Sequence, residues 1–420
     1  MVQIRPFRAL RPQKESVAAI AALPYDVYSK SEAREYVKTH PHSFLRIDRP
    51  ETQFDESFDM YAPAVYQRAD EIFEKMQKKQ VLIQDKKACY YIYQLTKGCH
   101  VQTGLCACSS VEDYVKGVIK KHEETRKEKE EDRTKHIDVL SAQTGPALIV
   151  YHSRPAIRKV MESEKEKTPV YDFTAEDGVQ HKVWVIDDPY CIRKLTGLFE
   201  TVDHTYIADG HHRAASAARV SQKRAGNNPH HTGNEEYNYF LTVLFADDEL
   251  EILDYNRVLK DTNGHSREEI LKRISERFRV TSSGSEPIHP KEKGEMSFFL
   301  SDSNGIHGTW YCLRVKKQYI KQDPIGILDV EYLQREILKP VFGIGDPRSD
   351  DRIDFVGGVR GYRELERRCR SDCVCAFALY PTSMEELLSA ADANLCMPPK
   401  STWFEPKLRS GLFMHKIESF

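Results

Sequence analysis

The chain has 420 residues, of which 40% are hydrophobic and 30% are charged, and its formal net charge at pH 7 is -2. This composition excludes a disordered chain, and the balanced charge lacks the basic excess of a nucleic-acid-binding surface, so no nucleic-acid partner is expected. No run of eighteen apolar residues occurs, and the N-terminal MVQIRPFRAL lacks the apolar core of a signal peptide. We therefore expect a cytoplasmic protein of two or three domains with no membrane partner.

The ten cysteines contain no Cys-x-x-Cys pair, which is a common spacing of zinc ligands. Two Cys-x-Cys pairs, Cys106/Cys108 and Cys373/Cys375, have the spacing of side chains on one face of a strand. We expect reduced and mostly buried thiols rather than a zinc site built from cysteines.

The first elements mix helical and extended patterns. Ser29 or Ser31 is suited to cap a helix that continues to Val37, residues 44–47 are expected to form a strand, and residues 61–79 predict a second helix. No strict alternation of strand and helix is seen in this part of the chain.

The next elements continue the mixture. We expect a strand hairpin around Lys97-Gly98 and a long charged helix over 111–137 with Ser110 as its cap. Further expected elements are a strand at 145–152, a helix near 155–165 and a strand at 181–187. Because strands and helices mix rather than alternate, the pattern predicts an α+β fold with mixed sheets.

The hydrophobic pattern breaks between Thr262 and His265. We place a domain boundary there, with an N-terminal region at 1–262 and a C-terminal α+β region at 263–420.

The stretch YIADGHHRAASAARV, residues 206–220, is the densest group of polar side chains at an expected helix start. Residues 201–208 predict a strand, Asp209 is a good N-cap, and residues 210–220 have the composition of a closely packed helix. Free backbone N–H groups and the helix dipole make such a start suitable for phosphate, and Arg213 adds donors that suit phosphate or carboxylate.

The two histidines of this stretch are expected to be neutral, because the positive end of the helix dipole disfavours imidazolium. Successive helical residues point about 100° apart, so His211 and His212 cannot both face one ligand. A capped helix with surface histidines is the plain alternative.

The run from Lys120 to Lys135 is rich in both charges. A solvated helix with pairs such as Glu123 with Lys127 explains it simply. Yet Glu123, Arg126, Glu130 and Arg133 recur at three- and four-residue steps, so one helix stripe would interleave carboxylates with guanidinium groups and suit a polyphosphate. No GxxxxGK[ST] phosphate loop occurs, so side chains and the Asp209 helix start would have to bind phosphate.

The C-terminal stretch CMPPKSTWFEPKLRSGLF, residues 396–413, combines a rigid turn with several donors. Lys400, Ser401 and Thr402 would suit the carboxylate of an amino acid, with aromatic residues after them as anchors. A well-anchored loop without a ligand is the alternative.

Four stretches together resemble one family. ADGHHRAASA is similar to the DGHHR signature of free-serine kinases built on a ParB/sulfiredoxin-like scaffold. LPYDV, KKHEETRKEKEEDR and MPPKSTWFEPKLRSGL resemble the signatures of a longer relative, the pyrophosphate-dependent serine kinase type. The matches run from about Arg5 to His415 and so span nearly the whole chain.

The resemblance implies a phosphotransfer core that transfers a phosphoryl group from inorganic pyrophosphate to the hydroxyl of free L-serine with Mg²⁺. The products would be O-phospho-L-serine and phosphate, which would supply serine and cysteine metabolism. An upstream glutamate would act as base, and we expect Glu123, with Glu124 and Asp26 as rivals. The expected site is catalytic Glu123, Asp209 and His211; phosphate-binding Lys121, Thr125, Arg126, Arg133, Gly210, His212 and Arg213; serine-binding Lys400, Ser401 and Thr402; and Asp209 as metal ligand.

Three alternatives remain at this point. The same acceptor with ATP or ADP as donor is the nearest, because small nucleotide-using relatives also lack the phosphate loop. A ParB-like nucleotide- or nucleic-acid-binding module is the second, since a fold does not fix a function. A sulfiredoxin-like activity would need a cysteine at the signature, where His211 follows Gly210 instead.

Overall fold

The structure is a computed structural model that describes residues 1–302, 305 and 307–418. The chain forms two compact units, each with its own core. The first unit comprises Met1–Leu250 and Pro406–Phe420, and the second comprises Glu251–Glu405. The expected boundary at residue 262 therefore differs from the observed division.

Strand pairing explains the difference. Strand β14 (Tyr255–Leu259) pairs with β18 (Ile353–Gly357) and β19 (Cys375–Leu379), so the second unit begins before residue 262. The chain later returns to the first unit, where β21 (His415–Lys416) pairs with β7 (Ala142–Gln143). The first unit is thus built from two separated stretches of the chain.

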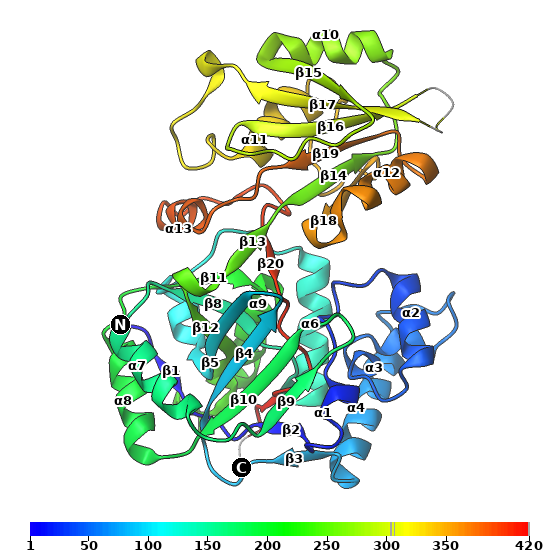
Figure 1. The fold of residues 1–420 in the computed structure, drawn as a ribbon. Helices are drawn as coiled ribbons and strands as arrows, with labels where there is room; N and C mark the ends of the chain where they lie inside the picture. The colour runs from blue at the N-terminus through cyan, green and yellow to red at the C-terminus, as the bar shows by residue number, and fades with distance from the viewer. Residues whose placement is uncertain (303–304, 306, 419–420) are drawn as a thin grey trace. The chain divides into compact units, whose positions relative to one another are not determined.

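A large mixed sheet organises the first unit (Figure 1). Its strand order is β6-β11-β8-β12-β5-β4-β10-β9, with β1 beside β5. The β11–β6 and β12–β8 pairs are parallel and the other pairs are antiparallel, which confirms the predicted α+β class. The strands are β1 (Ile4–Arg5), β4 (Tyr90–Lys97), β5 (His100–Ser110), β6 (Ile119–Lys120), β8 (Ala147–Tyr151), β9 (Tyr171–Thr174), β10 (Gln180–Ile186), β11 (Thr205–Asp209) and β12 (Tyr239–Ala246).

Helices and two small strand pairs complete this unit. Strand β2 (Leu10–Pro12) pairs with β3 (Leu82–Gln84) in addition to the β7–β21 pair. The helices are α1 (Val17–Ile20), α2 (Lys30–Thr39), α3 (Leu45–Asp48), α4 (Pro63–Lys78), α5 (Val111–Val115), α6 (Lys127–Leu140), α7 (Pro155–Lys165), α8 (Pro189–Glu200) and α9 (His211–Asn227), with 3₁₀ turns at Pro50–Gln53, Glu236–Asn238 and Asp247–Glu249.

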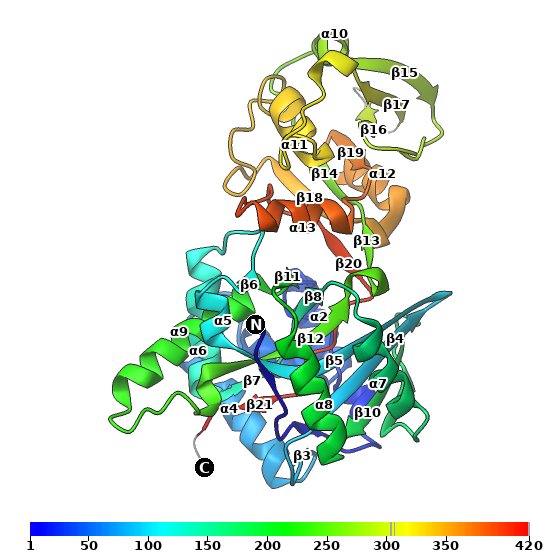
Figure 2. The ribbon, with the colours of Figure 1, turned by 90° about the vertical axis from the view of Figure 1, so that its left-hand side faces the viewer.

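Helices α7, α8 and α9 bury their apolar side chains against the large sheet, and Figure 2 shows α7 and α8 side by side. One core cluster joins Ile92 and Leu105 of the sheet with Ile157 of α7, Phe199 of α8 and Ala214 of α9. Burial of such side chains is the main favourable term in folding. This packing fixes the position at which α9 begins.

Two expected elements of this unit were wrong. Residues 44–47 belong to helix α3 rather than to a strand, because Leu45 and Ile47 are buried in a cluster with α4. The expected helix over 111–137 is interrupted: Gly117 takes a left-handed φ of 74°, and β6 then pairs with β11 before α6 begins. Glycine adopts that conformation without steric cost, so the helix ends there.

The second unit has its own sheet, with the order β15-β17-β16-β19-β14-β18 (Figure 1). The other strands of this sheet are β15 (Phe278–Gly284), β16 (Glu295–Ser301) and β17 (Gly308–Val315). Strands β13 (Glu251–Leu253) and β20 (Trp403–Glu405) form a separate pair in the second unit. Its helices are α10 (Arg267–Arg277), α11 (Asp329–Leu333), a π-helix at Gln334–Leu338, α12 (Gly361–Ser371) and α13 (Met384–Asp392), with 3₁₀ turns at Lys317–Tyr319 and Gly358–Arg360. Val258, Phe299, Trp310 and Leu365 form its core.

Within the described residues, no helix combines the length and the apolar character that crossing a membrane requires.

Candidate functional site

The candidate site lies in the first unit, where three strands of the large sheet meet. Strands β6 and β11 are parallel, with Thr205 opposite Ile119 and Tyr206 opposite Lys120. Parallel neighbours end at the same edge of a sheet, so the residues after Lys120 and those after Tyr206 come together there. Strand β8 is antiparallel to β11, so its first residues lie at the same edge.

The turn between β11 and α9 depends on Gly210. This residue has φ 92° and is the N-cap of α9, a position that we had assigned to Asp209. A Cβ atom on Gly210 would lie 2.9 Å from Nε of Arg213, and the left-handed φ is strained for other residues. Asp209 instead ends strand β11, and its carboxylate is held by cations.

Asp209 lies between two cationic side chains. The Nζ of Lys407 donates a hydrogen bond to Oδ2 of Asp209 at 3.0 Å, and Nη2 of Arg213 lies 3.8 Å from Oδ1. The side chains of Lys407 and Arg213 are only 12% and 14% exposed. Arg213 also donates to the carbonyl of Pro146, just before β8. The start of α9 thus carries two largely buried cations beside one carboxylate.

Lys407 was not among the expected site residues. It lies in the fourth motif, MPPKSTWFEPKLRSGL, from which we had chosen Lys400, Ser401 and Thr402. The only sequence signal for Lys407 is its place in that motif, because the contact with Asp209 spans 198 positions.

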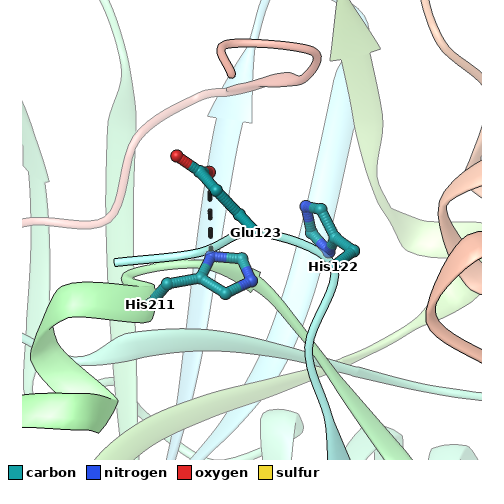
Figure 3. Close-up of side chains that lie close together, drawn as sticks. All are labelled: His122, Glu123 and His211. Atoms are coloured by element: carbon teal, nitrogen blue, oxygen red, sulfur yellow. Dashed lines mark ion pairs between the residues drawn. The ribbon is translucent and has the colours of Figure 1, made fainter. Parts of the chain in front are cut away.

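Glu123 and His211 meet at this edge together with His122, which the sequence analysis had not singled out (Figure 3). Oε2 of Glu123 lies 3.9 Å from Nδ1 of His211. The rings of His122 and His211 are nearly perpendicular, with centroids 4.6 Å apart. The sequence signal for His122 is its position directly before Glu123.

Both imidazoles of this group are neutral. Burial lowers the pKa of His211 to about 3, and the charges of Lys121 and Arg213 act in the same direction. Burial and the neighbouring His211 lower the pKa of His122 to about 3. We expected neutral histidines from the helix dipole, but for His211 burial is the main cause.

His212 does not lie with His122, Glu123 and His211, as expected because His211 and His212 are successive helical residues. Its Nε2 accepts a hydrogen bond at 3.0 Å from the backbone N–H of Arg126, the N-cap residue of α6. Thr125, another expected phosphate ligand, donates its hydroxyl hydrogen bond to Glu130. Lys121 is exposed and acts on the pKa of His211 through its charge.

The expected stripe of Glu123, Arg126, Glu130 and Arg133 on one helix was wrong, because α6 begins only at Lys127. Glu130 accepts from Thr125 and forms an ion pair with Arg219 of α9.

Arg133 is buried and hydrogen-bonded within its own helix and to helix α3. Its Nε donates to Asp132 at 2.9 Å, and its Nη1 donates to the carbonyl of Asp48 at 3.1 Å.

A small cavity of about 30 Å³ is lined by residues of all four motifs. Tyr25 of LPYDV lies below the guanidinium of Arg133, with 4.4 Å between Cζ and the ring centroid. Tyr25, Arg133, Arg213 and Ser410 all line the cavity, and each comes from a different motif. The volume suits about one water molecule, so this is a structural support of the site rather than a substrate pocket.

The rival bases differ from Glu123 in their surroundings. Asp26 and Glu124 are exposed, whereas the Glu123 side chain is 35% exposed and faces His211.

Lys400, Ser401 and Thr402 belong to the second unit. The hydroxyl of Ser401 donates to the carbonyl of Pro398 at 2.6 Å, and its own carbonyl accepts from Thr382 at 2.9 Å. Nζ of Lys400 lies 5.5 Å from the ring centroid of Tyr255. Their role in binding serine stays a prediction.

Comparisons with known proteins give one family match. The profile of the family described as "Protein of unknown function (DUF1015)" matches residues 4–331. No match was found among curated proteins.

Several solved structures are similar at low identity. A mutant free serine kinase in complex with AMP is 14% identical with a TM-score of 0.34, over 72% of this chain and 87% of that chain. A conserved hypothetical protein from Pyrococcus furiosus is 12% identical with a TM-score of 0.32, over 74% and 94%. SbnI with a C-terminal truncation, from Staphylococcus aureus, is 10% identical with a TM-score of 0.37, over 72% and 84%.

Proposed function

The chain belongs to the DUF1015 family, and we propose that it is a phosphotransferase that moves a phosphoryl group from inorganic pyrophosphate to the hydroxyl of free L-serine. The observation that carries the proposal is that Glu123 follows β6 and Asp209 ends the adjacent parallel strand β11, where Lys407 and Arg213 lie beside the Asp209 carboxylate. A proton acceptor and a group of cations at one sheet edge are what phosphoryl transfer requires. The resemblance of ADGHHRAASA to free-serine kinases supports serine as the acceptor, and the resemblance of the other three motifs to the pyrophosphate-dependent type supports pyrophosphate as the donor.

The cations would bind and orient the transferring phosphoryl group. Arg213 and Lys407 are largely buried, so their charges are screened less by water than those of surface residues. The first N–H groups of α9 add donors for the same oxygens. Such fixed donors stabilise the charge that spreads over the equatorial oxygens in the transition state.

Glu123 would accept the proton of the serine hydroxyl. The serine oxygen then forms a bond to phosphorus while the bridging oxygen–phosphorus bond of pyrophosphate breaks. Orthophosphate leaves with that bridging oxygen, and the hydroxyl proton remains on Glu123. The half-exposed carboxylate is reachable by a small substrate, whereas the buried His211 beside it is a poor acceptor because its pKa is about 3.

The residues at the site fit the Mg²⁺ ion that the resemblance implies. Mg²⁺ in such sites uses one or two carboxylates together with phosphate oxygens and water, and Asp209 supplies one carboxylate. Bound there, the ion would neutralise charge on the pyrophosphate. Lys407 donates a hydrogen bond to Oδ2 of Asp209 and so orients this carboxylate.

The proposal is tested by a donor screen. Purified protein receives L-serine and Mg²⁺ with pyrophosphate, ATP or ADP in separate reactions, and O-phosphoserine is measured by mass spectrometry. The Asp209→Asn variant, purified in the same way, controls for contaminating kinases. Product with pyrophosphate alone supports the proposal. Product with a nucleotide alone would show that the nucleotide, and not pyrophosphate, is the donor. No product from any donor overturns the phosphotransferase function.

A further inference from the structure

We propose that His122, Glu123 and His211 bind one divalent transition-metal ion of the zinc class. This site is separate in its chemistry from the Mg²⁺ expected on Asp209. The inference depends only on the three side chains and not on the proposed function.

The geometry of the three residues is suitable for a metal. One potential ligand atom from each side chain lies within 4.8 Å of the other two. Bonds of about 2.0–2.2 Å to nitrogen and oxygen bring the ligands of one zinc ion to within about 4 Å of each other. The 3.9 Å between Oε2 of Glu123 and Nδ1 of His211 meets this limit, and side-chain movement would have to shorten the remaining distances, which are at most 4.8 Å.

Two imidazole nitrogens of the group are buried and unsatisfied. Nδ1 of His122 and Nε2 of His211 have no hydrogen-bond partner, and the two residues are 3% and 5% exposed. A buried polar atom without a partner destabilises the folded protein, so such atoms are rare. A metal ion bound by Nδ1 of His122 would give that nitrogen a partner. Oε2 of Glu123 lies 3.9 Å from Nδ1 of His211, which exceeds a hydrogen-bond distance, so Glu123 does not occupy the nitrogen of His211 that faces it.

Both imidazoles are in the form that binds metals. A metal ligand must be unprotonated, and burial keeps both rings neutral with pKa values of about 3. A hydrogen bond to the carbonyl of Ile207 acts on His122, which leaves Nδ1 as the nitrogen free to bind. Histidine ligands commonly use their second nitrogen in this way.

The donor set selects the class of metal. Imidazole nitrogens suit zinc, copper, iron and nickel, whereas Mg²⁺ prefers oxygen ligands. Two histidines and one carboxylate leave a coordination position open, as in catalytic zinc sites. The second oxygen of the Glu123 carboxylate is not needed as a metal ligand and can still accept a hydrogen bond.

The test is metal binding by the full-length protein after treatment with a chelator. Co²⁺ is titrated while its visible absorption is followed, and Zn²⁺ is then added as a competitor. We expect one Co²⁺ per chain, displacement by Zn²⁺ and no displacement by excess Mg²⁺. Variants His122→Asn, His211→Asn and Glu123→Gln should each bind at least roughly 100-fold more weakly. His204→Asn, which changes an exposed histidine outside the group, should bind as the wild type does.

A second measurement avoids the question of whether the variants fold. X-ray absorption of the Zn²⁺-loaded wild type should show nitrogen and oxygen neighbours with imidazole scattering. Sulfur neighbours would assign the metal to some of the ten cysteines and overturn the proposal. Absence of stoichiometric Co²⁺ and Zn²⁺ binding would overturn it as well. Because metal binding is measured without substrates, failure here is distinguishable from failure of the donor screen.

Discussion

Lys407 donates a hydrogen bond from Nζ to Oδ2 of Asp209 at 3.0 Å, across 198 positions of the sequence. The contact joins the last motif of the chain to the DGHHR motif. Asp209 also lies 3.8 Å from Arg213, so the carboxylate is shared between two cations. A phosphate bound at the start of α9 would be attracted by both of them.

Lys407→Met should lower kcat/KM for phosphoserine formation by about 100-fold or more, as expected for the loss of one fixed charge at a phosphoryl site. Steady-state assays with pyrophosphate and L-serine measure the change. Lys416→Met is the matched control, because Lys416 pairs with Glu418 on the same segment and should be neutral. Wild-type activity in a folded Lys407→Met protein would remove Lys407 from the site.

Asp209→Asn and Arg213→Ala should each reduce turnover by orders of magnitude while the circular dichroism spectrum stays unchanged. Arg213 also donates to the carbonyl of Pro146, so Arg213→Lys serves as a milder variant that keeps the charge. We expect this variant to fall between wild type and Arg213→Ala. Near-normal rates in folded variants would contradict the assignment.

Glu123→Gln should abolish measurable turnover if Glu123 accepts the serine proton. Its neighbour Glu124 is exposed and makes Glu124→Gln the matched control, with turnover close to wild type expected. Single-turnover assays separate the chemical step from substrate binding. If only Glu124→Gln is inactive, the base is Glu124 and the position of Glu123 beside His211 has another purpose.

Gly210→Ala should impair activity more than stability. The new Cβ atom would lie 2.9 Å from Nε of Arg213 and the backbone would keep a strained φ of 92°. The flexible Arg213 side chain would move away, which displaces its charge from Asp209. Gly197→Ala is the matched control. Gly197 lies in helix α8, no atom lies within 4 Å of the new Cβ, and activity should stay unchanged. Equal activities of the two variants would show that Arg213 tolerates the shift.

Asp329 of the second unit should make the free energy of unfolding depend on pH. Burial raises its pKa from 3.8 to about 7 in the folded protein, so the folded state holds a proton that the unfolded state releases. The contribution of the Asp329 proton to the free energy of unfolding is complete below about pH 4. Above that pH it decreases by about 1.4 kcal/mol per pH unit until about pH 7, where it is lost.

Asp329→Asn removes this titration while its amide oxygen can still accept the hydrogen bond from the N–H of Gly294. Urea unfolding of both proteins at pH 5 and pH 8 gives the comparison. The stability of the variant relative to wild type should increase with pH. A constant difference would show that Asp329 is ionised in the folded protein throughout this range.

Local features were largely predictable from the sequence. The hairpin around Lys97-Gly98 is present, because Lys97 pairs with His100 across a tight turn. Ser110 caps α5 by accepting from the N–H of Asp113, as its side chain and position suggested. Caps and tight turns depend on neighbouring residues, so a single sequence contains the information for them.

Long-range features were not predictable. Strand β6 covers only Ile119–Lys120, and two residues within a charged run have no periodicity that distinguishes a strand from a helix. The pairing of β6 with β11 brings Glu123 to His211. The motifs therefore identified these two residues but did not indicate why they lie close together. His122 and Lys407 were missed because their significance lies entirely in that tertiary arrangement.

The division of the first unit into two stretches of chain has a consequence for protein synthesis. The stretch that carries Lys407 and Ser410 is translated only after the whole second unit. A nascent chain can form most of the large sheet early, yet Asp209 meets Lys407 only after residue 407 has left the ribosome. The order of the segments therefore delays assembly of the complete site until the whole second unit has been synthesised, and chains terminated before residue 407 would lack the contact.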